Sequence, residues 1–345
     1  MTFDNTQAHA ADELSLTELD LYHLIMDYRA TKGLAPIPLS ENLTTTAGRH
    51  AADSLYNIWE AGLTLPEGAN LHSWSDAFYY SDHRSPEVIW EAPSRIGTDY
   101  PGYGFEISAA GYGDIASALT GWQGSTGHDQ VIVNEGVWAS QTWNAIGIGV
   151  EFDASVGTYG GRIYHVWFGR EADPDGAGTI AGGAEADTVK GTAFDDVIRG
   201  AAGADTLTGE GGNDRLRGDA GDDTLGGGQG RDKLDGGTGR DVLSGHGGRD
   251  RIDGGKGNDI LKGGGKSDLF VFDDANWGRD KIRDYNGDRV KISAPGEAAD
   301  LVELAAAITD RNGSAVYDHG GDGKNVIVFQ GVTEAELNFA LFDLG

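Results

Sequence analysis

The stretch Gly236–Gly264 reads GGTGRDVLSGHGGRDRIDGGKGNDILKGG. Glycine is too frequent in it for a helix or an ordinary strand, because glycine loses more backbone entropy on folding than any other residue. An aspartate and an aliphatic residue nevertheless recur at a constant spacing, as in Asp241 with Leu243 and Asp250 with Ile252. This spacing indicates a repeated structural unit rather than a flexible spacer.

The repeat unit has nine residues, and ten units follow one another over 182–271 without an insertion. The sixth position is always aspartate: Asp187, Asp196, Asp205, Asp214, Asp223, Asp232, Asp241, Asp250, Asp259 and Asp268. The eighth position is always apolar: Val189, Ile198, Leu207, Leu216, Leu225, Leu234, Leu243, Ile252, Leu261 and Phe270. The competing interpretation, a disordered glycine-rich linker, requires no such strict phase.

In each unit a glycine-rich turn alternates with a short strand whose aliphatic side chain points inward. A unit this small holds no core of its own. Units therefore stack, and the stack forms two parallel ladders of aliphatic side chains with successive coils about 4.8 Å apart. The sequence predicts an all-β parallel β-roll over 182–271.

Stacking also brings the aspartates into line. Two unit charges at this separation repel by about 1 kcal/mol in water and by several-fold more near a protein surface. A series of such repulsions offsets much of the ~5–15 kcal/mol stability of a domain, so the array needs a neutralising cation. Carboxylate and carbonyl oxygens, with no cysteine and a single histidine (His246) in the array, favour Ca²⁺ over zinc or copper.

The array closely resembles the repeats-in-toxin (RTX, hemolysin-type) family, whose unit is GGxGxDxUx, best of all from Gly200 to Lys262. In that family two units make one coil of a parallel β-roll, and Ca²⁺ lies between stacked turns. The resemblance implies several Ca²⁺ ions bound by turn carbonyls and by Asp196, Asp205, Asp214, Asp223, Asp232, Asp241, Asp250, Asp259 and Asp268. The ends of the array depart from the pattern, because Glu185, Phe194 and Lys266 replace the fourth-position glycine.

The segment 272–345 is expected to form a β-rich C-terminal cap, with strands at LFVFDD, DKIRDY, RVKIS and NVIVFQ. It resembles the segment that follows the repeats in serralysin-like secreted proteins, including the pattern D-x-I-x-D-[FY] at Asp280 to Tyr285. This resemblance implies export from a Gram-negative bacterium by a type I secretion apparatus that reads an uncleaved C-terminal signal. Folding on extracellular calcium after transport is the hypothesis that follows.

The composition and the N-terminal stretch limit the expected partners and the route of export. The net charge is −29 and every part of the chain is acidic, so nucleic acid and anionic membrane surfaces are not expected partners. The N-terminal stretch MTFDNTQAHAADELSLTELD carries acids where a secretory signal needs a basic start and an apolar run. No segment approaches the ~20 apolar residues of a membrane span. We expect a secreted protein with no N-terminal signal peptide and no transmembrane segment.

Residues 1–170 predict a separate α+β domain, joined to the array by a linker over 171–181. Alternating apolar residues in AIGIGVEF (Ala145–Phe152) and RIYHVWFG (Arg162–Gly169) predict paired strands after a series of helices, which indicates an α+β sandwich. Capping residues or proline mark four helix starts, at Ser15, near Ser40, at Ser85 with Pro86, and at Asp114.

Three stretches of this domain carry candidate site residues: LHSWSD with His72, GYGFEIS with Glu106, and GWQGSTGHDQVIVN with His128. Their order is similar to the CAP superfamily (cysteine-rich secretory proteins, antigen 5, pathogenesis-related 1) in its cysteine-free bacterial form, over roughly Leu19 to Gly169. The resemblance implies an α-β-α sandwich with His72, Glu106 and His128 lining a cavity. Many members carry a second cavity glutamate where this chain has Ser125. His50 lies on the apolar stripe of the second helix and is expected in the core, with the cavity as the alternative.

Known enzyme signatures are missing from the sequence, which contains neither H-E-x-x-H nor G-x-S-x-G. The CAP resemblance implies a binding module for a lipid, sterol, glycan or protein surface, and we do not expect a transition metal in its cavity. The alternative is a cation-dependent hydrolase, with Glu106 as general base and a metal ion on His72 and His128. A third interpretation is a passenger domain that the repeats attach to a cell surface.

Overall fold

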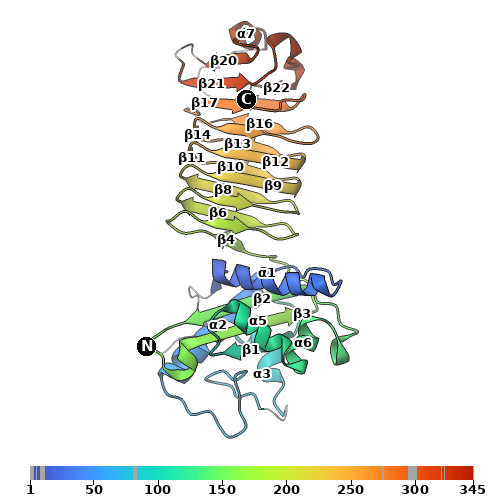
Figure 1. Cartoon of the computed structure of the whole chain (residues 1–345), viewed down its shortest axis with the longest axis vertical. Helices are drawn as coiled ribbons and strands as arrows, with labels where there is room; N and C mark the ends of the chain where they lie inside the picture. The colour runs from blue at the N-terminus through green and yellow to red at the C-terminus, as the bar shows by residue number, and fades with distance from the viewer. Residues whose placement is uncertain are drawn as a thin grey trace. The chain divides into compact units, whose positions relative to one another are not determined.

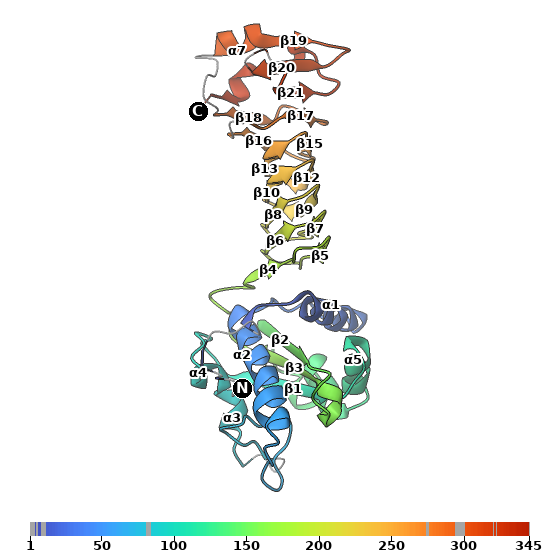
Figure 2. The same cartoon turned by 90° about the vertical axis from the view of Figure 1, so that its left-hand side faces the viewer.

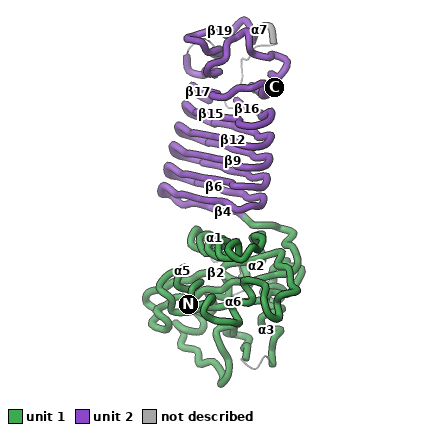
Figure 3. Tube along the Cα trace, turned by 45° about the vertical axis from the view of Figure 1, so that its right-hand side comes forward, with its two compact units in different colours: residues 1–178 green, residues 179–345 purple. Residues whose placement is uncertain are grey.

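The structure is a computed structural model that describes residues 4, 6–7, 12–80, 84–273, 276–293, 301–319, 321 and 323–344, without the side chains of 301–303 (Figure 1). Part of the N-terminal stretch on which the expected absence of a signal peptide rests lies outside these residues, as does part of the predicted cap. The chain divides into two compact units, 1–178 and 179–345 (Figure 3). In the described part of the chain, no helix combines the length and the apolar character that a membrane span requires.

The main helices of the first unit begin where the sequence predicts. Ser15 caps the first helix and forms a capping box with Glu18, in which each side chain accepts from the other's backbone N–H. Ser40 and Asp114 cap two further helices through their side-chain oxygens. The helices are α1 (Leu16–Thr31), α2 (Glu41–Ala52) with its π-helical extension η2 (Asp53–Glu60), α3 (Glu87–Trp90), α4 (Ala92–Arg95), α5 (Ile115–Gln123) and α6 (Thr126–Ile132).

The sheet of the first unit has the order β1-β3-β2 and is antiparallel. β2 (Ala145–Phe152) and β3 (Arg162–Gly169) are the predicted pair. The sequence pattern did not predict β1 (Gly104–Ala110), which lies along the other edge of β3. α2 covers one face of the sheet and α5 the other (Figure 2), which is the expected α-β-α sandwich.

Two glycines of β2 let α2 lie directly on the strand backbone. A Cβ atom added at Gly147 would lie 2.1 Å from the backbone carbon of Leu43, and one at Gly149 would lie 2.2 Å from that of Ala47. The helix is thus held at a close and defined distance from the sheet. Its last turn carries His50, which reaches across to the side chains of β1 and β3.

The second unit is a parallel β-solenoid, the β-roll that the repeats predict (Figure 1). Its coils alternate between two sheets. One sheet contains β4 (Thr179–Ala181), β6 (Val197–Ala202), β8 (Arg215–Ala220), β10 (Lys233–Asp235), β11 (Thr238–Gly239), β13 (Arg251–Asp253), β14 (Lys256–Gly257), β16 (Leu269–Phe272), β18 (Arg289–Ile292) and β22 (Phe342–Asp343). The other contains β5 (Thr188–Lys190), β7 (Thr206–Thr208), β9 (Thr224–Gly230), β12 (Val242–Gly248), β15 (Ile260–Lys262), β17 (Arg279–Ile282) and β21 (Asn325–Phe329). Two antiparallel strands, β20 (Ala315–His319) and β19 (Ile308–Asp310), and the helix α7 (Leu301–Ala307) complete the C-terminal end.

Each coil buries one apolar side chain from each sheet. Leu234 lies between Leu216 and Ile252 in the first sheet, and Leu243 occupies the equivalent place in the second. All ten apolar residues at the eighth position of the repeat are at most 1% exposed. The predicted pair of aliphatic ladders is therefore the core of this unit.

The solenoid extends beyond the predicted array at both ends. β4 lies within the expected linker 171–181, and Ile180 in it is fully buried beside Ile198. Asp173, in the same segment, accepts a hydrogen bond from the backbone N–H of Asn42 at 3.0 Å. After residue 271, β17 pairs in parallel with β15 and β18 with β16, so the expected cap begins as a continuation of the coils. The linker segment has no sequence periodicity, and for this reason its specific contacts could not be predicted.

Candidate calcium sites and a buried histidine cluster

The sixth-position aspartates stack in two series along the solenoid, which together make up the aspartate line: one series runs through Asp205, Asp223 and Asp241, and the other through Asp214, Asp232 and Asp250. Asp223 Oδ1 accepts from the backbone N–H of Asp205 at 2.8 Å, and Asp241 Oδ1 accepts in the same way from Asp223. The same bond recurs every 18 residues along the repeats at 2.8–2.9 Å. The structure places all nine aspartates expected as ligands in this line, at most 2% exposed: Asp196, Asp205, Asp214, Asp223, Asp232, Asp241, Asp250, Asp259 and Asp268.

The second carboxylate oxygen of most of these aspartates is buried without a partner. Within the described residues, no hydrogen bond reaches Oδ2 of Asp205, Asp214, Asp223, Asp232, Asp241, Asp250, Asp259 or Asp268. A buried polar atom without a partner costs about 1–3 kcal/mol, and more when it is charged. This repeated cost points to a cation, and carboxylate oxygens are ligands that Ca²⁺ prefers.

The first glycine of the repeat leaves room for these oxygens. A Cβ atom added at Gly218 would lie 2.3 Å from Asp223 Oδ2 and 2.6 Å from the carbonyl oxygen of Gly236 on the next coil. A carboxylate oxygen and a main-chain carbonyl oxygen therefore converge beside this glycine. Side-chain and carbonyl oxygens together are the mixed ligand set typical of calcium sites, so the residues present fit the ion that the repeats imply.

The electrostatics of the line also favour a bound cation. Burial, with a further contribution from the charges of Asp196 and Asp232, raises the pKa of Asp214 to about 7. Burial similarly raises the pKa of Asp259 to about 7. An opposite charge within a few ångströms favours the ionised form of a carboxyl group and counteracts this effect of burial.

Two aspartates outside the repeats continue the line. Asp280 Oδ1 accepts from the N–H of Asp259 at 2.9 Å, and Asp288 Oδ1 accepts from the N–H of Asp268 at 3.0 Å. Both aspartates are fully buried, and the Oδ2 atom of Asp280 lacks a partner among the described residues. The repeat phase did not predict them, because insertions lengthen the spacing from 18 to 21 and 20 residues. The sequence did contain a signal for these two aspartates. Each is followed two residues later by an apolar residue, as D-x-I or D-x-V, which is the spacing of the sixth and eighth positions of the repeat.

In the first unit, three histidines surround the carboxylate of Glu106. His50 Nδ1 lies 2.7 Å from Oε1, and His72 Nδ1 lies 2.9 Å from Oε2. His165 Nδ1 also contacts Oε1. The side chains of His50, His165 and Glu106 are fully buried, whereas that of His72 is 18% exposed. The cluster therefore approaches the surface at His72.

The sheet and α2 bring these side chains together. Glu106 and Ser108 share one face of β1, and Ser108 pairs with His165 on β3. Ser108 Oγ lies 2.8 Å from His165 Nδ1 and 3.2 Å from His72 Nδ1. His50 enters from α2, and its ring stacks on that of His165 with 4.0 Å between centroids. Burial, followed by the charge of His50, lowers the pKa of His165 to about 4.

Of the three residues expected to line one cavity, His72, Glu106 and His128, the structure brings the first two into direct contact. His72 contacts Glu106 directly, whereas His128, in α6, interacts with both through charge. Burial, followed by the charge of His72, lowers the pKa of His128. His50 was expected in the core, with a position facing the cavity as the alternative. It is buried and also contacts Glu106, so both descriptions apply to it. His165 was not predicted, because HVWFG reads as an ordinary strand; a histidine at a buried strand position was the available signal.

The surroundings of Glu106 do not suit a general base. Burial raises the pKa of its carboxyl group, but the charges of His50, His165 and His72 outweigh burial and hold that pKa well below its usual range. An efficient general base has a pKa near the working pH. Ser108 and Glu106 both contact Nδ1 of His72, whereas a serine relay uses the two different ring nitrogens. A carboxylate that stays ionised is suited to accept hydrogen bonds from histidines or to bind a cation.

Comparison with protein families connects this geometry to known repeats. The family described as "RTX calcium-binding nonapeptide repeat (4 copies)" matches residues 181–216, 190–225 and 226–261. The chain carries RTX calcium-binding repeats. The matched RTX ranges end before Asp268, Asp280 and Asp288, although the same hydrogen bonds continue through all three. A comparison with curated proteins found no match.

Several solved structures resemble parts of the chain at low identity. An outer surface protein of Borrelia burgdorferi is 15% identical, with a TM-score of 0.32, over 46% of this chain and 96% of that one. A cysteine-rich secretory protein of Staphylococcus aureus is 16% identical, with a TM-score of 0.29, over 45% and 38%. The extracellular lipase LipA of Serratia marcescens is 18% identical, with a TM-score of 0.24, over 49% and 40%.

We predict that Gly218→Ala impairs the calcium-dependent folding of the RTX repeats and that Gly211→Ala does not. The new methyl group at Gly218 collides with Asp223 Oδ2 and with the next coil, whereas the nearest atoms at Gly211 are 3.9 and 4.0 Å away. Overpacking of this kind costs about 1–3 kcal/mol. Far-UV circular dichroism during a calcium titration measures the folding midpoint. Equal midpoints for the two variants would contradict the role given to Gly218.

Proposed function

We propose that this chain is a secreted calcium-binding protein whose RTX unit folds around several Ca²⁺ ions outside the cell. The observation that carries the proposal is the line of buried Oδ2 atoms that lack partners among the described residues. These atoms recur in the same surroundings on successive coils, so one kind of ligand must satisfy them all. Divalent cations bound between the turns would give every one of these oxygens the same kind of partner.

The donor atoms favour calcium among the divalent cations. The ligands available in the line are carboxylate and carbonyl oxygens, and the chain has no cysteine that could provide a thiolate. Mg²⁺ demands near-ideal octahedral geometry and keeps several waters, whereas Ca²⁺ accepts flexible sets of six to eight oxygens. In the solenoid the carboxylate and carbonyl oxygens come from two successive coils. Such a ligand set fits a calcium site better than a magnesium site.

Calcium binding and folding then form one process. Ligand that binds only the folded state stabilises it by about 2.7 kcal/mol per site at 100 times the dissociation constant. At low cytosolic calcium the RTX unit stays unfolded, and extracellular calcium folds it after export through a type I secretion apparatus. In the folded unit β22 pairs with β18 and Phe342 is 8% exposed, so a C-terminal export signal is more accessible before folding than after.

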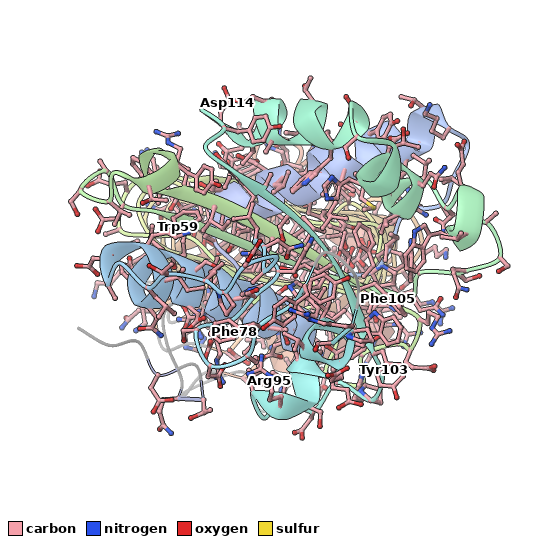
Figure 4. The ribbon with its side chains drawn as sticks, turned by 90° about the horizontal axis from the view of Figure 1, so that it is seen from below. Trp59, Phe78, Arg95, Tyr103, Phe105 and Asp114 are labelled. Atoms are coloured by element: carbon pink, nitrogen blue, oxygen red, sulfur yellow. The ribbon has the colours of Figure 1, made fainter. Side chains whose placement is uncertain are left out.

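For the first unit we propose a binding module of the CAP type. A surface pocket of about 520 Å³ is lined in part by Tyr103, Arg170 and Glu171. Tyr103 and Phe105 lie on the same side of the first unit (Figure 4), and the centroids of their rings are 6.3 and 6.2 Å from that of Trp90. Trp90 and Tyr103 are 41% and 48% exposed. Exposed aromatic rings beside a concave surface are typical of a contact with a ligand or partner. A lipid, a sterol, a glycan and a protein surface all present apolar groups suited to these rings.

We predict that the full chain, but not a variant ending at residue 324, reaches the medium of a Gram-negative host that expresses a type I apparatus. The deletion removes β21 and β22 and with them the proposed signal. Immunoblotting of cells and medium measures the distribution of each protein. Retention of the intact chain in the cells, or export of the shortened one, would overturn the export hypothesis.

We predict that Asp223→Asn weakens calcium binding at least about tenfold, the loss expected for a charged ligand worth more than 1.4 kcal/mol. The asparagine keeps an acceptor for the Asp205 N–H but replaces the unpartnered Oδ2 with an amide nitrogen that cannot bind Ca²⁺. Asp222→Asn is the matched control, because Asp222 carries the same charge one residue earlier but is exposed and paired with Arg240 at 2.6 Å.

Isothermal titration calorimetry of the full chain with CaCl₂ measures the affinity and the number of sites in both variants. The proposal requires a loss of affinity or of sites in Asp223→Asn and wild-type behaviour in Asp222→Asn. Equal losses in the two variants would show that net charge, rather than the buried line, governs calcium binding.

A further inference from the structure

We propose that His50, Glu106 and His165 form a binding site for one divalent transition-metal ion of the zinc type. One nitrogen of each histidine and one oxygen of Glu106 all lie within 4.8 Å of one another. Two imidazoles and a carboxylate are a donor set that zinc accepts, whereas calcium takes oxygen ligands. The site lies wholly within the first unit and does not depend on the calcium-binding function proposed for the RTX unit.

The hydrogen bonds of His50 require a cation at its Nδ1 atom. Its Nε2 atom lies 3.1 Å from the carbonyl oxygen of Ser73, and a carbonyl only accepts, so Nε2 carries a proton. Neutral His50 then directs the lone pair of Nδ1 at Glu106 Oε1, 2.7 Å away. Two lone pairs at this distance repel each other. A proton shared by the two atoms, or a metal ion bound by both of them, removes that repulsion.

His165 brings a second imidazole nitrogen to the same carboxylate oxygen. Its Nδ1 atom contacts the same oxygen of Glu106, and its ring is stacked on that of His50 with an angle of 19° between the planes. Two stacked rings that both carried a positive charge would repel each other, whereas one ion shared by the two rings needs no charge on either. Neutral imidazole is the form of histidine that binds metals. A single ion bound by Nδ1 of both rings and by the Glu106 carboxylate would be held by all three side chains together.

The atoms around the cluster hold the ligands as in a metal site. The hydrogen bond from His50 to the Ser73 carbonyl is the type of outer contact that sets the tautomer of a metal-binding histidine. The His50 ring also lies flat on Trp74, with 4.3 Å between centroids and 7° between planes. Since the three ligands are fully buried and come from α2, β1 and β3, the ion would join the helix to the sheet and have a structural role.

The probe for this site is Co²⁺ added to the full chain in calcium-saturated buffer. Cobalt bound by histidine and carboxylate absorbs visible light, whereas Ca²⁺ has no such transitions, so the RTX unit gives no signal. We expect one equivalent of Co²⁺ per chain to produce visible absorption that Zn²⁺ abolishes. A folded wild-type chain that shows no absorption with Co²⁺ overturns the proposal and leaves a cluster held by a proton.

The ligand set is tested with three histidine variants. His50→Gln and His165→Gln should each weaken cobalt binding at least about tenfold, whereas His128→Gln, outside the set, should bind as the wild type does. Tryptophan fluorescence reports whether the first unit is folded, because seven of the eight tryptophans precede residue 170. If His50→Gln does not fold, the ligand set is tested by the cobalt titrations of His165→Gln and of the wild-type chain. Loss of absorption in His128→Gln, or its retention in folded His165→Gln, overturns the assignment.

Discussion

The second unit depends on one constraint, the stacking of identical aspartate carboxylates at the spacing of neighbouring β-strands. One oxygen of each carboxylate accepts the N–H of the preceding coil, and this bond prevents the side chain from turning towards solvent. The other oxygen is buried beside a glycine and the carbonyl of the next coil. The aliphatic ladders that form the core keep the coils in the register that brings these charges together. A cation bound to these oxygens would therefore be a component of the fold rather than an addition to it.

The repeats could be predicted from the sequence because their physical requirements recur at a constant interval. An aspartate, an inward aliphatic residue and a close-packed glycine must return every nine residues, and the phase of Asp223, Leu225 and Gly218 shows this directly. Asp280 and Asp288 satisfy the same requirements but follow insertions, and a search in a constant phase excludes them. The strand Thr179–Ala181 was missed for a related reason, since a single edge strand has no repeat of its own.

The first unit shows which part of a site local sequence can reveal. Helix starts at Ser15 and Asp114 follow from capping chemistry, which acts within a few residues. His72 and Glu106 were found together, whereas His165 was not, because its role depends on the register of β1 against β3. That register is a contact between distant parts of the chain and leaves no local pattern. The same strand pairing places Ser108 beside His165 and brings His165 to the carboxylate of Glu106.

Hydrogen exchange of the full chain, in calcium and after dialysis to remove calcium, tests the central claim most directly. The backbone N–H groups of Asp205, Asp223 and Asp241 donate to the carboxylates of the line, so they report whether the line is formed. The account predicts strong protection of these amides in calcium and free exchange without it. Equal protection in the two conditions would contradict the account, because the line would then be stable without a cation.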